Sequence, residues 1–287
     1  MPQPLPTGHS QNLYPSDEDL KLALKLIQRK GIPKIPKIVA ALRDELNNTD
    51  YNVDKIIQLI SQDPSITGQI IKLINSPAYA RSNRIEDIKH ASMVLGIQQV
   101  ANLVTAESLA ALSQSETQAV QVVWESINRT AKAAVAISNL LPNFSADEAY
   151  LLAMMHDIGS IIFAGLWENY SDTWDKLILA PVSMIEKERK AIGVEHTTLS
   201  FLLAKHWKLP DKYALAIYHH HSASCEHIPD EKTRMMVATL KLANYLVISS
   251  SGSHVNSQME SYMQSALKEL MINDEDWEQI KSDAFWL

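Results

Sequence analysis

The chain has 287 residues, of which 46% are hydrophobic and 21% charged, so it can build a hydrophobic core and is not globally disordered. Its single cysteine, Cys225, excludes an internal disulfide and a cysteine-based zinc site, and no apolar run approaches the ~18 residues of a membrane-spanning helix. The net charge of −7 is concentrated in residues 151–287, which hold 12 Lys and Arg against 18 Asp and Glu. This balance argues against a broad nucleic-acid surface, and the absence of a signal-peptide pattern predicts a cytoplasmic location.

The N-terminal part is predicted to begin with a disordered leader over residues 1–16, which are rich in proline and small polar residues. A helix is predicted over 16–30, because acidic residues occupy its first turn and a glycine follows its last. Two prolines keep 32–37 from being helical throughout. Apolar residues then recur at helical spacing over 53–60 and again over 66–74.

Capping residues mark the helix ends in the next stretch. Asp63 is a predicted N-cap followed by a proline at the first helical position, and Asn75-Ser76-Pro77 ends that helix. Helices are predicted on both sides of Gly96, up to about residue 112. The polar segment 113–117 is predicted to join two helical halves.

The second half also shows only helical patterns. A long helix is predicted over 120–141, and Ser145 with Glu148 forms a capping box for the next one. Further helices are predicted at roughly 174–192, 197–206, 210–221, 231–249, 257–271 and 275–283. No alternating strand pattern and no repeat is evident, so the predicted fold class is all-α.

The domain organisation follows from these elements. We predict the disordered leader over 1–16, an N-terminal helical subdomain over 17–112, a helical bundle over 118–250, and C-terminal helices over 251–287.

The most informative segment for chemistry is Ala153–Gly159, which contains His156 next to Asp157. An imidazole and a carboxylate on adjacent residues form a compact start for a metal site. The apolar stretch before the pair places it inside a packed bundle, where bundle metal sites are built. The alternative is a helix-end aspartate beside a hydrogen-bonded core histidine.

Other histidines follow. His196 opens a predicted helix, and His219-His220-His221 ends another. A histidine triplet at a helix C-terminus also has a purely structural explanation, because it interacts favourably with the helix dipole. His206 lies between lysines at a predicted surface position, and the loop histidines receive no function: His9, His227 and His254.

Several blocks of the sequence resemble the HDOD domain, a regulatory relative of the HD-superfamily phosphohydrolases. The blocks are Ile32–Lys37, Asp63-Pro64 with Asn75–Tyr79, Ile85 and Ala91 with Leu95-Gly96, Met154–Gly159, and Trp207–Pro210 with His220-His221. Each block is a modest signal, but their order and spacing make the match specific over about residues 32–246. The resemblance implies an HD-type helical bundle with a smaller N-terminal helical subdomain.

The sequence departs from the related phosphohydrolases at two metal ligands. Those enzymes hold metal on a first histidine, the HD pair and a distal aspartate. The matching stretches here place Ser126 in Trp124–Ile127 at the first position and Asn244 in Leu242–Leu246 at the distal one. Neutral hydroxyl and amide groups bind a divalent cation more weakly than imidazole and carboxylate do. We therefore predict no catalytic residue and a vestigial pocket made of Ser126, His156, Asp157, His196, His220, His221 and Asn244.

The resemblance implies a non-catalytic bacterial signal-transduction protein that acts through signalling proteins or a small nucleotide ligand, without a cofactor. The short leader leaves no room for a receiver, GGDEF or EAL domain, so we expect the signal to arrive through a partner or ligand. A second surface is predicted around Asn75, Tyr79 and Arg81, although packing at a helix end also explains Tyr79.

The alternative is a metal-dependent phosphohydrolase that acts on a nucleotide or cyclic dinucleotide. It would hold divalent iron, manganese, zinc or nickel on His156, Asp157, His196 and His220. We expect no membrane partner. A nucleic-acid partner has little support beyond local Lys and Arg residues at 21–43.

Overall fold

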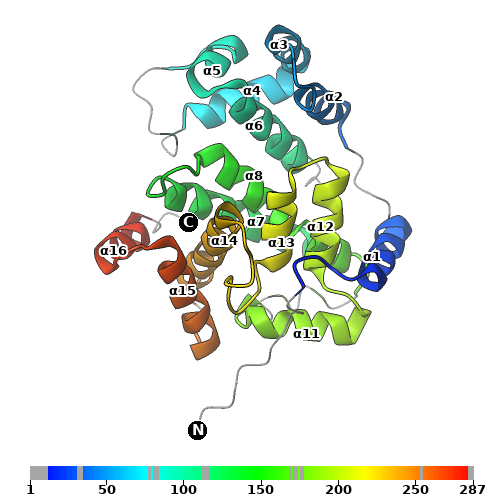
Figure 1. The fold of residues 1–287 in the computed structure, drawn as a ribbon, viewed down its shortest axis with the longest axis vertical. Helices are drawn as coiled ribbons and strands as arrows, with labels where there is room; N and C mark the ends of the chain where they lie inside the picture. The colour runs from blue at the N-terminus through cyan, green and yellow to red at the C-terminus, as the bar shows by residue number, and fades with distance from the viewer. Residues whose placement is uncertain are drawn as a thin grey trace.

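The computed structural model describes residues 12–30, 35–76, 79, 84–111, 117–167, 170, 174, 178–252 and 255–283. These described residues form helices and no strand, which confirms the predicted all-α class (Figure 1). Predictions that concern residues 1–11, Gly31, Arg81 and 112–116 lie outside the described residues. Within the described part, no helix combines the length and apolar character needed to span a bilayer.

A first group of helices lies at the top of Figure 1: α2 (Lys37–Leu46), α3 (Val53–Ser61), α4 (Pro64–Ile74), α5 (Ile88–Leu95) and α6 (Ile97–Ala110). It encloses its own apolar cluster, which includes Ile56, Ile70 and Leu103. Asp63 caps α4 as predicted, because its Oδ1 accepts a hydrogen bond from the Ile66 amide at 3.0 Å. Gly96 has φ 95° and separates α5 from α6.

A larger group of helices surrounds the second apolar cluster. Its members are α7 (Gln118–Ser138), α8 (Ala146–His156), α9 (Ile158–Ala164), α11 (Pro181–Ile192), α12 (His196–His206), α13 (Asp211–His219) and α14 (Glu231–Ser250). On its outside, α15 (Ser257–Leu270) packs on α14, and α16 (Asp274–Asp283) brings Trp277 to 5.9 Å from the ring of Tyr245. Figure 1 shows α15 and α16 together at one side of this bundle.

The first helix, α1 (Asp17–Lys30), differs from the predicted organisation. It packs against α9 and α12 rather than with α2–α6, and its Ala23 and Ile27 belong to the larger apolar cluster. An ion pair from Arg189 Nη1 to Asp19 Oδ1 at 2.8 Å also ties it to α11. The prediction from sequence order therefore assigned this helix to the first group, whereas its apolar face packs against helices of the second group.

The helix predicted over 174–192 is not continuous. Its long C-terminal part is α11, which begins at Pro181. Ala180 before it has φ −135° and ψ 67°, outside the helical region, because a proline disfavours the helical conformation of the residue that precedes it. Gly193, with φ 95°, ends α11 in the left-handed conformation.

A buried polar network joins the two groups of helices. Arg43 of α2 donates from Nη2 to Asn102 Oδ1 at 3.3 Å and to Thr105 Oγ1 at 3.0 Å, both on α6. Asn102 Nδ2 in turn donates to Asp147 Oδ2 of α8 at 2.8 Å. Burial lowers the pKa of Arg43 and, outweighing the bond from Asn102, raises the pKa of Asp147. The network connects the N-terminal group to the helix that ends at His156.

Gly159 allows the backbones of α9 and α12 to touch. A Cβ atom at this position would lie 2.1 Å from the carbonyl oxygen of His196, a distance that no side-chain rotation can relieve. The amide of Gly159 also donates to Ser200 Oγ at 2.9 Å. The glycine after the His-Asp pair is therefore required for the approach of the helix that carries His196.

We predict that Gly159→Ala lowers the free energy of unfolding by at least about 2 kcal/mol, because the backbone of His196 must move away. Gly68→Ala is the matched control, since a Cβ there meets no atom within 4 Å inside α4. The control should raise stability by roughly 0.5–1 kcal/mol. Urea unfolding of both variants checks this, and equal stability of Gly159→Ala and the wild type would contradict the close contact.

Candidate metal centre

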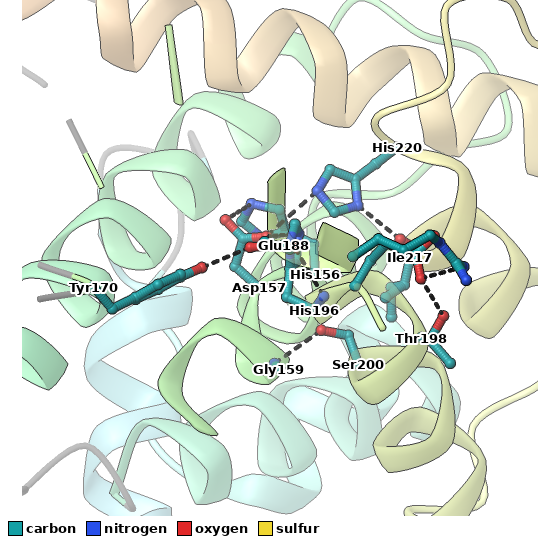
Figure 2. Close-up of polar contacts among 12 residues, drawn as sticks. His156, Asp157, Gly159, Tyr170, Glu188, His196, Thr198, Ser200, Ile217 and His220 are labelled. Atoms are coloured by element: carbon teal, nitrogen blue, oxygen red, sulfur yellow. Dashed lines mark hydrogen bonds and ion pairs between the residues drawn. The ribbon is translucent and has the colours of Figure 1, made fainter. Parts of the chain in front are cut away.

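The centre of the larger bundle collects histidines from several helix ends around one aspartate (Figure 2). His156 is the last residue of α8, and Asp157 sits at the junction of α8 and α9. His196 is the first residue of α12, and His220 and His221 follow α13 directly. All five residues are buried, with at most 5% of the surface of any of them exposed.

The carboxylate of Asp157 faces three imidazole nitrogens. Its Oδ2 lies 3.1 Å from His156 Nε2, and its Oδ1 lies 3.1 Å from His196 Nε2 and 3.3 Å from His220 Nε2. These pairs are close but lack hydrogen-bond geometry, so the three Nε2 atoms and Asp157 Oδ1 have no hydrogen-bond partner among the described residues. Buried polar atoms left in this state indicate a missing partner at the point where they meet.

The other ring nitrogens of the same histidines determine where their protons lie. Nδ1 of His156 is 2.6 Å from the Ala153 carbonyl oxygen, and Nδ1 of His220 is 2.6 Å from that of Ile217. A carbonyl oxygen only accepts, so each Nδ1 carries a proton and each neutral ring presents the Nε2 lone pair to Asp157. Lone pairs facing a carboxylate repel it unless a cation or a proton lies between them.

His196 is oriented by a second buried carboxylate, that of Glu188 on α11. Glu188 Oε2 lies 2.7 Å from His196 Nδ1 and accepts the backbone amide of His196 at 3.0 Å. Tyr170 donates its hydroxyl to Glu188 Oε1 at 2.9 Å. A carboxylate behind a ligating histidine is the usual support of a metal site, since it fixes the ring and raises its basicity.

Four of the residues converge closely enough to hold one ion. One ligand atom from each of Asp157, His196, His220 and His221 lies within 4.8 Å of all the others. Neither ring nitrogen of His221 has a hydrogen-bond partner among the described residues. Imidazole nitrogens with one carboxylate oxygen suit zinc, iron, manganese or nickel, so the donor set fits a divalent metal. His156 flanks this set on the Oδ2 side of Asp157, whereas His221 lies within it.

The electrostatics of the cluster favour positive charge. Burial raises the pKa of Asp157, but the facing histidines outweigh it and hold this pKa well below its usual value. Burial lowers the pKa of His196, but Glu188 and Asp157 outweigh it and raise it to about 10. For His220 burial dominates and lowers the pKa to about 4. Two buried carboxylates thus attract positive charge, as protons or as a metal cation, to the place where the imidazoles meet.

The two positions that the resemblance matches to metal ligands lie beside this cluster. Ser126 and Asn244 line a small pocket together with Asp157 and His221, so the structure places all four on one cavity wall. The pocket has a volume of about 20 Å³, enough for one water-sized group. Asn244 Oδ1 accepts a hydrogen bond from Thr130 Oγ1 at 3.0 Å. Sequence reasoning did not find Glu188, since no local pattern connects it with the histidines.

The remaining predicted residues lie elsewhere. Asn75 pins the chain after α4, because its side chain donates to the Ile85 carbonyl at 2.8 Å and accepts the Ile85 amide at 2.9 Å. His206 ends α12 and is exposed. His219 faces away from the cluster, with Nε2 at 2.9 Å from the Leu13 carbonyl and Nδ1 at 3.2 Å from His227 Nε2.

Fold and centre together define an all-helical protein of the HD type, with a buried histidine–aspartate cluster at the heart of its bundle. Residues 32–223 match the sequence profile of the HDOD domain, and the chain belongs to the HDOD family. This confirms the resemblance found in the sequence.

Solved structures share the fold at low sequence identity. An HDOD domain protein of unknown function from Geobacter sulfurreducens is 20% identical, with 93% of this chain and 97% of that chain covered and a TM-score of 0.61. A "putative metal-dependent phosphohydrolase" from Shewanella amazonensis is 17% identical over 92% and 97% of the two chains, with a TM-score of 0.64. A "putative signal transduction protein" from Marinobacter aquaeolei is 20% identical over 96% of this chain and 66% of that one, with a TM-score of 0.65.

A curated relative is longer than this chain. An uncharacterized protein of Treponema pallidum (strain Nichols) is 23% identical over 248 residues, which are 83% of this chain and 46% of the relative. The chain therefore spans about half the length of that protein.

The support from Glu188 generates a prediction. Glu188→Gln should weaken the binding of Mn²⁺ or Zn²⁺ about 10- to 100-fold, because the neutral amide orients His196 less firmly and makes its Nε2 less basic. Isothermal titration of metal-free protein measures the affinity. Glu186→Gln on the same helix is the matched control, because it removes an equal charge from a residue that is not buried. If the two variants behave alike, Glu188 does not support a metal ligand.

Proposed function

We propose that this HDOD chain is a non-hydrolytic regulatory protein of bacterial signal transduction, whose HD-type bundle uses one divalent metal ion to bind a small ligand. Proteins of its fold include ones named for signal transduction and ones named for phosphohydrolysis. The proposal rests on the chain's own residues and not on these names. We place the protein in the cytoplasm, where the ligand or a protein partner delivers its signal.

The observation that carries the proposal is the set of unpartnered Nε2 atoms around Asp157. A site that no longer bound an ion would be more stable if larger side chains filled this space or if these atoms were hydrogen-bonded. Each buried unpaired polar atom costs about 1–3 kcal/mol. The chain instead retains four buried ligand atoms and a supporting carboxylate. A metal-binding role accounts for this arrangement.

The wall beside the cluster argues against hydrolysis. A bound metal ion lowers the pKa of a coordinated water and polarises a phosphoryl oxygen. Hydrolysis also needs groups that take up a proton and hold the attacking water. On the pocket wall Ser126 is neutral, and Asn244 engages its carbonyl oxygen with Thr130. Neither is a base at neutral pH, and Asp157 and His221 on the same wall belong to the metal donor set, so we infer binding without turnover.

The second candidate is a metal-dependent phosphohydrolase for a nucleotide or cyclic dinucleotide. It is favoured by the same convergent donor set, which leaves one side facing the small pocket. Under this hypothesis the substrate phosphate would occupy the side next to Ser126.

Elemental analysis and a hydrolysis assay on the same purified sample separate the two functions. We expect about one equivalent of divalent metal per chain and no metal-dependent release of phosphate from nucleotides or cyclic dinucleotides above background. Removal of the metal with a chelator should lower the melting temperature, because a ligand that binds only the folded state stabilises it. Turnover by the metal-loaded wild type would replace the regulatory function with the hydrolytic one.

Restoring the ancestral ligands tests the interpretation of the two substitutions. Ser126→His with Asn244→Asp should raise metal affinity, because it adds a nitrogen ligand and a negative charge on the pocket wall. Calorimetric titration of the metal-free double variant checks this. Ser249→His with Asn128→Asp is a control that adds the same groups on α14 and α7 at positions away from the pocket lining. Unchanged affinity in the first variant would show that these positions do not face the ion.

A further inference from the structure

A second, larger cavity opens beside the metal cluster. Its volume is about 190 Å³, and it lies between α7, the end of α14 and the side chains of Trp174 and Ile178. It shares a wall with the small pocket that Asp157 and His221 line, because the same four residues border both: Ser126, Ile178, Val247 and Ile248. The larger cavity also includes the exposed residues Glu125 and Ser251. It therefore lies on the solvent side of the small pocket, and the four shared side chains stand between the two.

Two helix faces build this cavity. α7 contributes residues 122, 125, 126 and 129, α14 contributes 247 and 248, and residue 251 follows directly after α14. Spacings of three, four and seven residues place side chains on one face of a helix. Ser126 thus stands at the shared wall, with Glu125 beside it and Arg129 one turn further along the same face.

Arg129 supplies a fixed positive charge in this cavity. Its Nη2 donates to Ser250 Oγ at 2.9 Å, which anchors the guanidinium to the end of α14. A guanidinium carries five N–H donors in a fixed plane, so it can hold an anchor and bind phosphate oxygens together. Phosphate binds arginine with two parallel hydrogen bonds, in a geometry that a lysine does not reproduce.

The rest of the lining limits what else the ligand contains. Trp174 and Ile178 give the cavity an apolar side. The exposed carboxylate of Glu125 accepts hydrogen bonds from hydroxyl groups and repels a second phosphate. The described lining residues therefore suit a ligand with one phosphate and a hydroxyl-bearing body.

The volume of the cavity narrows the class of ligand further. Pockets for drug-sized molecules measure about 300–1,000 Å³. A cavity of about 190 Å³ is below that range, so its size favours a compact ligand over a cyclic dinucleotide.

We propose that the cavity between α7 and α14 binds a compact sugar phosphate or an equivalent phosphate monoester. Its phosphate lies on the Ser126 side, within reach of Arg129 and next to the pocket that leads to the cluster, and its hydroxyl groups lie near Glu125. The inference rests on the proposed function, since it names the ligand class of the same site.

Calorimetric titration with ribose 5-phosphate tests the proposal, with ribose and cyclic di-GMP as comparison compounds. Wild-type protein should bind ribose 5-phosphate and neither of the others. Arg129→Gln should weaken that binding about 10- to 100-fold, the range expected for lost hydrogen bonds to a charged group. Lys132→Gln is the matched control, because it removes the same charge from an exposed residue of α7 that does not line the cavity.

The fold of each variant is checked by circular dichroism and thermal unfolding. If Arg129→Gln does not fold, Arg129→Lys replaces it; this variant keeps the charge, loses the planar donors and should weaken binding by a smaller factor. Equal affinity of the wild type and the Arg129 variant would overturn the inference. Arg129-dependent binding of cyclic di-GMP that is tighter than that of ribose 5-phosphate would also overturn it.

Metal content, measured on the same samples, distinguishes this inference from the proposed function. Metal-loaded protein that does not bind ribose 5-phosphate would overturn the proposed ligand class but not the proposed metal centre. Protein that binds no metal but binds ribose 5-phosphate through Arg129 would support the cavity and overturn the metal-based function. Loss of both kinds of binding would overturn both proposals.

Discussion

A carboxylate buried among imidazoles is the constraint around which this bundle is organised. Asp157 has 5% of its surface exposed, and a charge in such a place is costly unless groups of opposite charge or hydrogen-bond donors face it. The compensating groups come from separate helix ends: α8 ends at His156, α12 begins at His196, and α13 is followed by His220. Helix ends far apart in the sequence must therefore meet at one point. The packing of the apolar clusters holds these helix ends together.

The same constraint explains how each histidine around Asp157 is held in its orientation. The Nδ1 atoms of His156 and His220 are held by carbonyls three residues earlier in the chain, so local helix geometry alone orients them. His196, at the start of its helix, has no preceding turn to hold it, and Glu188 of α11 takes that role. Gly159 then sets how closely the helix of His196 approaches. Each histidine has the support that its position in its helix requires.

Much of the fold and part of the site could be predicted from the sequence, for identifiable reasons. Capping residues such as Asp63 and the proline breaks act locally, so they located helix ends well. The resemblance to HD proteins identified Ser126 and Asn244, and both indeed line one pocket with Asp157.

Features that depend on long-range packing were missed. Glu188 lies in an ordinary polar helix, and only the fold brings it to His196. The placement of α1 was missed for the same reason, because amphipathic spacing shows that a face is buried but not against which partner. The cavity beside Ser126 combines α7 with α14, and no sequence pattern pairs those two faces.

Helix α8 forms a rigid connection between the N-terminal helices and the metal cluster. Its first turn contains Asp147, which is bonded to Asn102 of the N-terminal helices, and its last residue is His156 at the metal cluster. Eleven residues of α-helix form a rod about 16 Å long that resists compression along its axis. Asp147 and His156 therefore lie at opposite ends of one rigid element, which fixes the position of α6 relative to the metal cluster.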